Sequence, residues 1–211
     1  GGFASNGDQG FLGYTKPQSS ISLTGSNSNY RGFVISNGDE YLSATYTSTT
    51  VYTTPSVKRY NATTGAYIGL SSIGTCTSHS TPLYSTYDAT SDGNGTVWTV
   101  SYSYRILVKW SVSATGAWTC LGTYSYSSTY YPMGVDIDVD PVTNTRRIVM
   151  GNFFDEMTSL YVNTAGASSF LDESVAEGIG PLTNNRVTFG ALFVDYDNDG
   201  HRDIFEVNGA I

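Results

Sequence analysis

Residues 195–203 carry the clearest chemistry in the sequence, because acidic side chains alternate there around a glycine. The four acids are Asp195, Asp197, Asp199 and Asp203. Gly200 permits the sharp turn that lets a short loop wrap several oxygens around one hard cation. The main-chain carbonyl of His201 is a further candidate ligand. We therefore predict that Asp195, Asp197, Asp199, His201 and Asp203 bind Ca²⁺. The alternative is an acidic surface turn without a metal, since Glu206, at the twelfth position, falls where the next strand has already begun.

The flanks of this loop resemble a known repeat. Residues 190–194 (GALFV) and 204–209 (IFEVNG) resemble the FG-GAP, or VCBS-like, calcium-binding repeats of integrin-type propellers. Residues 170–180 (FLDESVAEGIG), followed by the loop, are similar to the UnbV and cartilage acidic protein group. The resemblance is confined to about residues 150–211. It implies a calcium-stabilised β-propeller, usually extracellular, that serves in adhesion or as a scaffold and is not an enzyme.

Other groups that could do chemistry are few. Cys76 and Cys120 are the only cysteines, and an even pair in an apparently exported chain favours a disulfide between adjacent repeats over two free thiols. Asn61 and Asn94 begin Asn-x-Thr sequons and are candidate glycosylation sites. No nucleophile or zinc-protease motif occurs, so we expect no catalytic residues.

Further acids allow weaker alternatives. Asp136, Asp138 and Asp140 alternate, which indicates one face of a strand more than a second calcium loop, because no glycine turn follows them. The pairs at 155–156 and 172–173 could host glycoside hydrolysis, but no sequence argument brings them to the distance it requires. Surface turns are the better interpretation, and a glycan hydrolase is the least favoured function.

The composition limits the fold class. Only 13% of the 211 residues are charged, whereas 14% are aromatic and 23 are Gly. A helical bundle would need far more Ala, Leu, Glu and Lys, while Thr, Tyr and Val favour strands and Gly and Asn favour turns. The formal net charge is −8, so we expect no nucleic-acid partner. No apolar run is long enough to span a membrane, and the start Gly1-Gly2-Phe3 suits a mature, exported product.

A repeat of about 50 residues organises the chain. Similar hairpins occur at residues 57–67 and 108–118 and, in a weaker form, at 160–170, and their turn glycines are Gly65, Gly116 and Gly166. A second strand pair precedes each hairpin, for example around the Asn37-Gly38 turn. Four short strands per repeat are typical of propeller blades. We therefore predict an all-β propeller of about four four-stranded blades.

The blades are expected at residues 30–70, 84–122, 133–172 and 187–211 of one domain. The last has only two strands, and residues 1–15 form the missing hairpin. This hairpin closes the ring within one chain, or it pairs with a neighbouring chain, which gives head-to-tail contacts and a fibre. The sequence thus predicts a secreted structural or adhesive protein of the cell surface, partnered by itself or by other extracellular proteins or glycans.

The alternative function is carbohydrate binding. Aromatic rings with a polar tip suit sugar stacking or a protein interface. Four tyrosines crowd one Ser/Thr-rich segment, namely Tyr124, Tyr126, Tyr130 and Tyr131. Six more alternate with small polar residues, namely Tyr46, Tyr52, Tyr84, Tyr87, Tyr102 and Tyr104. On this hypothesis Trp98, Trp110 and Trp118 line shallow sugar pockets. The plainer interpretation, which we favour, is that the tyrosines alternate between the buried and solvated faces of strands.

Overall fold

The structure is a computed structural model that describes residues 29–46, 56–80, 83, 86–92, 95–126, 131–140, 142–153, 157–163, 169–184 and 186–209. Strands dominate these residues, and one short helix interrupts them. The elements are β1 (Asn29–Ser36), β2 (Asp39–Tyr46), β3 (Ser56–Asn61), β4 (Tyr67–Leu70), β5 (Thr86–Ser91), β6 (Thr96–Ser101), β7 (Ile106–Val112), β8 (Trp118–Ser125), β9 (Pro132–Val139), β10 (Arg146–Asn152), β11 (Ser159–Asn163), β12 (Leu171–Asp172), α1 (Ile179–Thr183), β13 (Val187–Val194) and β14 (Asp203–Gly209).

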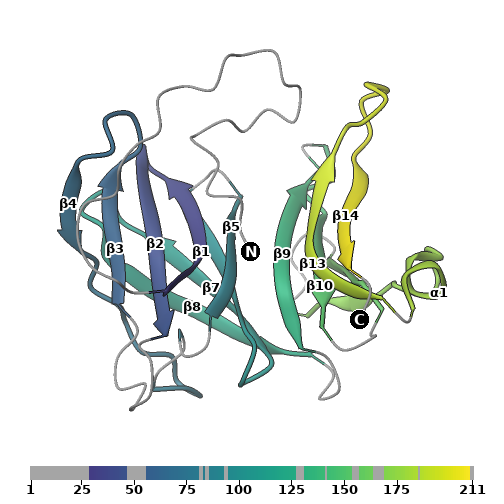
Figure 1. The fold of residues 1–211 in the computed structure, drawn as a ribbon, viewed down its shortest axis with the longest axis horizontal. Helices are drawn as coiled ribbons and strands as arrows, with labels where there is room; N and C mark the ends of the chain where they lie inside the picture. Colours follow the sequence, from purple (N-terminus) through teal and green to yellow (C-terminus); the bar gives the residue numbers. More distant parts are fainter. Residues whose placement is uncertain are drawn as a thin grey trace.

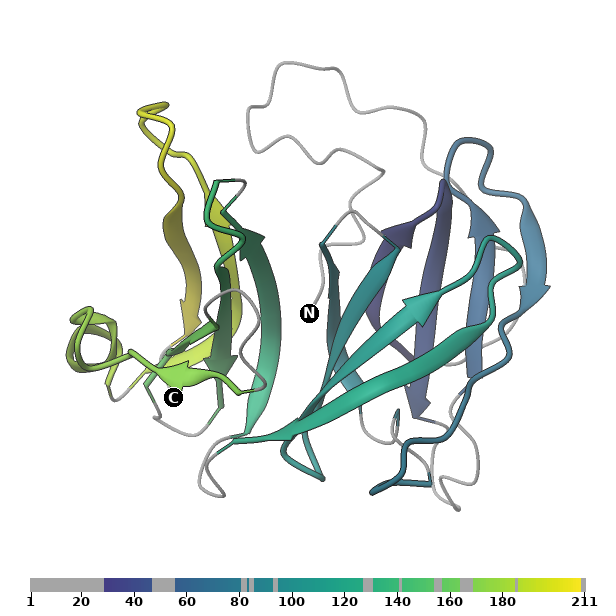
Figure 2. The same cartoon turned by 180° about the vertical axis from the view of Figure 1, so that it is seen from behind.

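The strands form sheets in chain order. Three antiparallel sheets contain β1–β4, β5–β8 and β9–β12, and a fourth contains β13 and β14. The first strand of each sheet lies beside the first strand of the next, so that β5 contacts β1 and β9, and β9 contacts β13 (Figure 1). The opposite view shows the third and fourth sheets on the other side of β5 from β1 (Figure 2). Successive antiparallel sheets that meet along their first strands are typical of propeller blades.

The all-β prediction is therefore confirmed. The number of blades and the closure of a ring stay predictions, because the predicted closing hairpin at residues 1–15 lies outside the described residues.

Tight turns set the pairing within the sheets. Asn37 and Gly38 have φ angles of 54° and 78°, as the left-handed turn between two antiparallel strands requires. The predicted Asn-Gly turn therefore joins β1 to β2. Gly65 and Gly116 have φ angles of 69° and 83° in the two stronger hairpins. The third hairpin turn, at Gly166, lies outside the described residues.

The apolar core is divided into three clusters, each between two neighbouring sheets. Trp110 and Trp118 from the second sheet pack with Val57 and Tyr41 from the first. The next cluster joins the second and third sheets, and the last joins the third sheet to Phe193 of β13. Neighbouring sheets thus bury the faces that meet, which is how stacked blades exclude water.

A disulfide fastens the chain that follows β4 to the outer strand of the second sheet. The backbone of Trp118 in β8 donates to Ser72 O over 2.8 Å and accepts from Gly74 N over 2.8 Å. Cys76 lies two residues after Gly74, and Cys120 lies two residues after Trp118. These two cysteines form the disulfide, with their Cα atoms 5.4 Å apart. The predicted disulfide is therefore confirmed.

Half-buried carboxylates join the first strands of successive sheets. Asp88 of β5 accepts the backbone N–H of Val135 in β9 over 2.9 Å. Asp136 of β9 accepts the N–H of Phe193 in β13 over 2.9 Å and the hydroxyl of Thr90 over 2.7 Å. Burial raises the pKa of Asp88 to about 7 and also raises the pKa of Asp136. These acids satisfy backbone donors at the sheet interfaces but make the interfaces sensitive to pH.

Candidate functional site

The acidic loop lies at the end of the two-stranded sheet. β13 ends at Val194 and β14 begins at Asp203, so residues 195–202 form the connection between them. Asn198 and Gly200 adopt φ angles of 60° and 88° there. Gly is the residue that this left-handed conformation favours, and Asn tolerates it better than most others. The residues within the loop thus determine its turn, as the alternating Asp and Gly pattern predicts.

Three of the predicted ligands converge. Carboxylate oxygens of Asp195, Asp197 and Asp203 all lie within 4.8 Å of one another. Asp195 is half-buried, and the other two are exposed. Backbone donors bend the loop around them, since Asp195 accepts the N–H of Gly200 over 3.1 Å and Asp203 accepts that of Tyr196 over 3.0 Å. Hard oxygen donors of this kind fit Ca²⁺, and these three residues would hold it.

Asp199 takes a different position from its predicted one, and the role of the His201 carbonyl stays a prediction. Asp199 is not part of the converging group. Its Oδ1 accepts the backbone N–H of His201 over 2.7 Å, and its own N–H donates to Asp195 over 3.0 Å. Asp199 therefore shapes the turn in this conformation. The sequence could not distinguish the two roles, because an Asp that caps a turn and an Asp that binds a cation occupy the same alternating positions.

The other alternating acids serve separate structural purposes. Asp136 and Asp138 lie on β9, and Asp140 follows it. Asp138 pairs with Arg147, whose Nε lies 3.1 Å from its carboxylate. Asp140 accepts the backbone N–H of Val142 over 2.7 Å and that of the next residue over 2.9 Å, and these hydrogen bonds lower the pKa of Asp140. Each of the three carboxylates thus has its own hydrogen-bond or ion-pair partners.

The predicted glycosylation sites fall differently in the structure. Asn61 ends β3, and its Oδ1 accepts the N–H groups of Thr63 and Thr64 over 3.0 and 2.8 Å. The side chain of Asn61 therefore caps the hairpin turn. Asn94 lies outside the described residues, as does the acid pair at 155–156. In the other acid pair, Asp172 accepts the backbone N–H of Ser174 over 3.0 Å.

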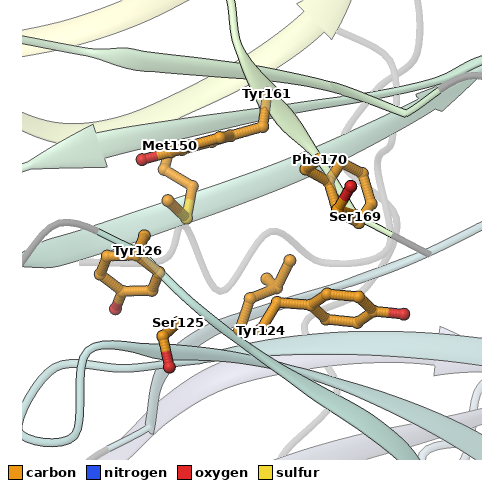
Figure 3. A pocket seen from close by; sticks show the side chains of 8 residues that line it. Tyr124, Ser125, Tyr126, Met150, Tyr161, Ser169 and Phe170 are labelled. Atoms are coloured by element: carbon orange, nitrogen blue, oxygen red, sulfur yellow. The ribbon is translucent and has the colours of Figure 1, made fainter. Parts of the chain in front are cut away.

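A pocket of about 180 Å³ opens between the second and third sheets (Figure 3). Its lining residues are Leu107, Tyr124, Ser125, Tyr126, Met150, Tyr161, Ser169 and Phe170. The sequence had marked Tyr124 and Tyr126 as aromatic candidates, but it could not show that the third sheet supplies the opposite wall. Met150 and Tyr161 lay in the third predicted repeat, and nothing else in the sequence marked them.

The proposed role of the tryptophans in sugar binding is wrong. Trp98, Trp110 and Trp118 are 1%, 0% and 3% exposed and belong to the core clusters between sheets. The Trp110 indole donates to Thr99 Oγ1 over 3.0 Å. A large apolar ring gains most from complete burial, which overrides its suitability for a shallow surface pocket.

No family model matches the chain. No curated protein matches it either. Among solved structures, it is similar to a protein of unknown function from Desulfotomaculum acetoxidans, with 12% identity and a TM-score of 0.56 over 94% of this chain and 63% of that one. The fold is therefore shared with that protein.

Two further solved structures resemble the chain less closely. The Dos1 propeller has 13% identity and a TM-score of 0.47 over 68% of this chain and 35% of that one. A GH43 β-1,3-galactosidase has 10% identity and a TM-score of 0.46 over 78% and 38%. The chain thus spans between about a third and just under two thirds of the length of these three structures. None of the helices in the described residues is long and apolar enough to cross a membrane.

Proposed function

We propose that this protein is a secreted, calcium-stabilised, non-enzymatic structural or adhesive module of the propeller type. The observation that carries the proposal is the difference between the fourth sheet and the other three. Each of the others has four strands, whereas β13 pairs only with β14 among the described residues. The edge of such a two-stranded sheet offers backbone donors and acceptors to an added strand.

The faces of this sheet support the proposal. Phe189, Leu192 and Val207 are 41%, 37% and 38% exposed. A hairpin added at β14 would extend the sheet to four strands and could cover more of its exposed apolar side chains. The predicted donor is the segment 1–15 of the same chain, which closes a ring, or of a neighbouring chain, which builds a fibre by head-to-tail contacts. The partners are then further copies of this chain or other extracellular proteins and glycans.

Calcium binding supports the same sheet. The loop that carries Asp195, Asp197 and Asp203 fixes the distance between the ends of β13 and β14. A cation held by the three carboxylates removes their mutual repulsion and stabilises the hairpin they terminate. The disulfide between Cys76 and Cys120 fits an oxidising, extracellular location.

The first test is a calorimetric titration of the protein with Ca²⁺ after treatment with EDTA. We expect a single site, which Asp197→Asn and Asp203→Asn weaken by about tenfold or more each, since each loses a charged ligand. Asp140→Asn is the matched control, because Asp140 is an acid in a turn outside the cluster. Equal calcium affinity in all four proteins would contradict the site.

The second test examines assembly. Size-exclusion chromatography with light scattering and negative-stain microscopy are performed with Ca²⁺ and with EDTA. The fibre form of the proposal predicts calcium-dependent oligomers or filaments. A protein that stays strictly monomeric with Ca²⁺ and with EDTA rules out the fibre. If that monomer is more stable with Ca²⁺ than with EDTA, closure of the ring within the chain is supported.

The second candidate function is carbohydrate binding. The supporting observation is the aromatic pocket between the second and third sheets, which is open to solvent and lined mainly by Tyr, Phe and Ser. Pockets of this composition, with a few polar groups among aromatic walls, are typical small-molecule sites. A glycan array tests this function, and the absence of binding to any saccharide would remove it. A glycan hydrolase remains the least favoured alternative.

A further inference from the structure

The pocket between the second and third sheets has a rigid aromatic frame. Tyr124 of β8 and Phe170, the residue before β12, meet edge to face, with ring centroids 5.3 Å apart and planes at 89°. Trp98 supports both rings, at 5.7 and 5.8 Å between centroids. Because Trp98 is 1% exposed and fixed in the core, the two rings that contact it are held in place. The wall is thus preorganised for a ligand.

The floor of the pocket is apolar, and its edges carry hydroxyl groups. Leu107 and Met150 are buried and form the apolar part of the lining. Five of the eight lining residues bear a hydroxyl, and none is charged at neutral pH. Ser125 and Ser169 are exposed at the rim. Figure 3 shows Tyr126, Ser125 and Tyr124 along one side of the pocket and Met150, Tyr161, Ser169 and Phe170 along the other.

One hydroxyl is fixed in a useful orientation. The Tyr126 hydroxyl donates to the carbonyl of Ser101 over 3.0 Å. Its hydrogen is therefore committed to the protein, while its oxygen can still accept a hydrogen bond. Burial raises the pKa of Tyr126, so the group remains a neutral phenol at physiological pH. Its ring contributes to the wall of the pocket, and its oxygen keeps the capacity to accept one further hydrogen bond.

The volume limits the ligand to one ring. A buried apolar cavity of about 150 Å³ accepts benzene, and this pocket measures about 180 Å³ and is open on one side. A neutral six-membered ring with an apolar face and hydroxyls around its edge complements aromatic walls, an apolar floor and a rim of hydroxyls. We propose that the pocket binds a single uncharged pyranose unit of a glycan. This inference rests on carbohydrate binding, the second of the functions proposed above, and locates it.

An aromatic side chain from a partner protein is the competing occupant. It would fill the apolar part of the pocket equally well. It would, however, leave the exposed hydroxyls of Ser125 and Ser169 to water, whereas ring hydroxyls of a sugar can bond them directly. The pyranose is therefore the occupant that uses both the apolar and the polar parts of the lining.

The test is a ligand-observed NMR titration of the full chain with the methyl pyranosides of glucose, galactose, mannose, fucose, xylose and N-acetylglucosamine, and with phenol as the aromatic probe. Wild-type protein is compared with Tyr124→Ala, Tyr124→Phe and the control Tyr196→Ala. Tyr196 is 79% exposed and lies in the acidic loop. A glycan array is run on the same four proteins, and backbone amide shifts are followed in the wild type.

We expect at least one pyranoside to bind. Its affinity should fall by about tenfold or more in Tyr124→Ala, which removes a wall, and by less in Tyr124→Phe, which keeps the ring. The control should bind as the wild type does. Amide shifts of Leu107, Met150 and Phe170 should move on titration, and this readout does not depend on whether Tyr124→Ala folds.

Three outcomes would overturn the inference. If the array and the titrations show sugar binding that leaves these amides unmoved and survives Tyr124→Ala, the pocket is wrong but carbohydrate binding stands. If no saccharide binds, both are wrong. If phenol alone binds and shifts the pocket amides, the occupant is an aromatic side chain and the pyranose assignment fails.

Discussion

A tight contact between the third and fourth sheets gives a quantitative prediction. A Cβ added at Gly134 of β9 would lie 2.8 Å from Gly190 Cα and 3.2 Å from Ala191 N. Both neighbours are backbone atoms of β13, so no flexible side chain can move away. Gly134→Ala must therefore push the two first strands apart. Gly190→Ala is the matched control, because a Cβ added there meets nothing within 4 Å.

The expected size of the effect follows from overpacking. Forcing an extra carbon into a packed interface costs about 1–3 kcal/mol, and in a protein of this length each kcal/mol lowers Tm by about 2–4 °C. Gly134→Ala should lower Tm by roughly 2–12 °C. Gly190→Ala should leave Tm unchanged or raise it slightly, since Ala restricts the unfolded chain by up to about 1 kcal/mol more than Gly.

The assay is differential scanning calorimetry of both variants and the wild type, with urea unfolding as a check on the free energy of unfolding. Circular dichroism should show unchanged strand content. Equal Tm values for Gly134→Ala and Gly190→Ala would refute the reasoning, because they would mean that β9 and β13 do not approach each other as described.

Two further predictions concern stability. The pKa of Asp88 is raised to about 7, so the folded state holds a proton that the unfolded state loses near pH 4. The contribution of Asp88 to the free energy of unfolding is fully present below about pH 4 and is lost as the pH rises to about 7. It amounts to at most about 4 kcal/mol. Thermal unfolding of wild type and Asp88→Asn between pH 4 and 8 measures it, and identical pH slopes would disprove the raised pKa. Separately, the double substitution Cys76→Ser and Cys120→Ser opens a covalent loop with a sequence separation of 44 residues and should lower the free energy of unfolding by about 2–4 kcal/mol in urea titrations. A change below about 0.5 kcal/mol would show that hydrogen bonds to β8 hold this segment without the disulfide.

The local features of the fold were predictable from the sequence. The Asn37-Gly38 turn and the turns at Gly65 and Gly116 depend on φ angles that few residues adopt, so the residue type indicates the geometry. The pairing of Cys76 with Cys120 was predictable because the chain contains no other cysteine.

Features that join different sheets were not predictable. The bond from Asp88 to the N–H of Val135 spans 47 residues, and nothing near Asp88 in the sequence indicates its partner. The same holds for the pocket, where Tyr124 belongs to β8 and Phe170 is the residue before β12. The acidic loop was predictable only in part. Its existence follows from the alternating acids, but Asp199 leaves the converging group because its carboxylate bonds the backbone two residues later.

Hydrogen exchange along β14 tests the central claim most directly. In a sheet of only two strands, the β14 amides that do not face β13 exchange rapidly with solvent, whereas an added strand protects them. The proposal predicts that these amides are protected with Ca²⁺ present and lose protection in EDTA, and that deletion of residues 1–15 also removes it. Rapid exchange of these amides in calcium-loaded, full-length protein would contradict the completed fourth blade.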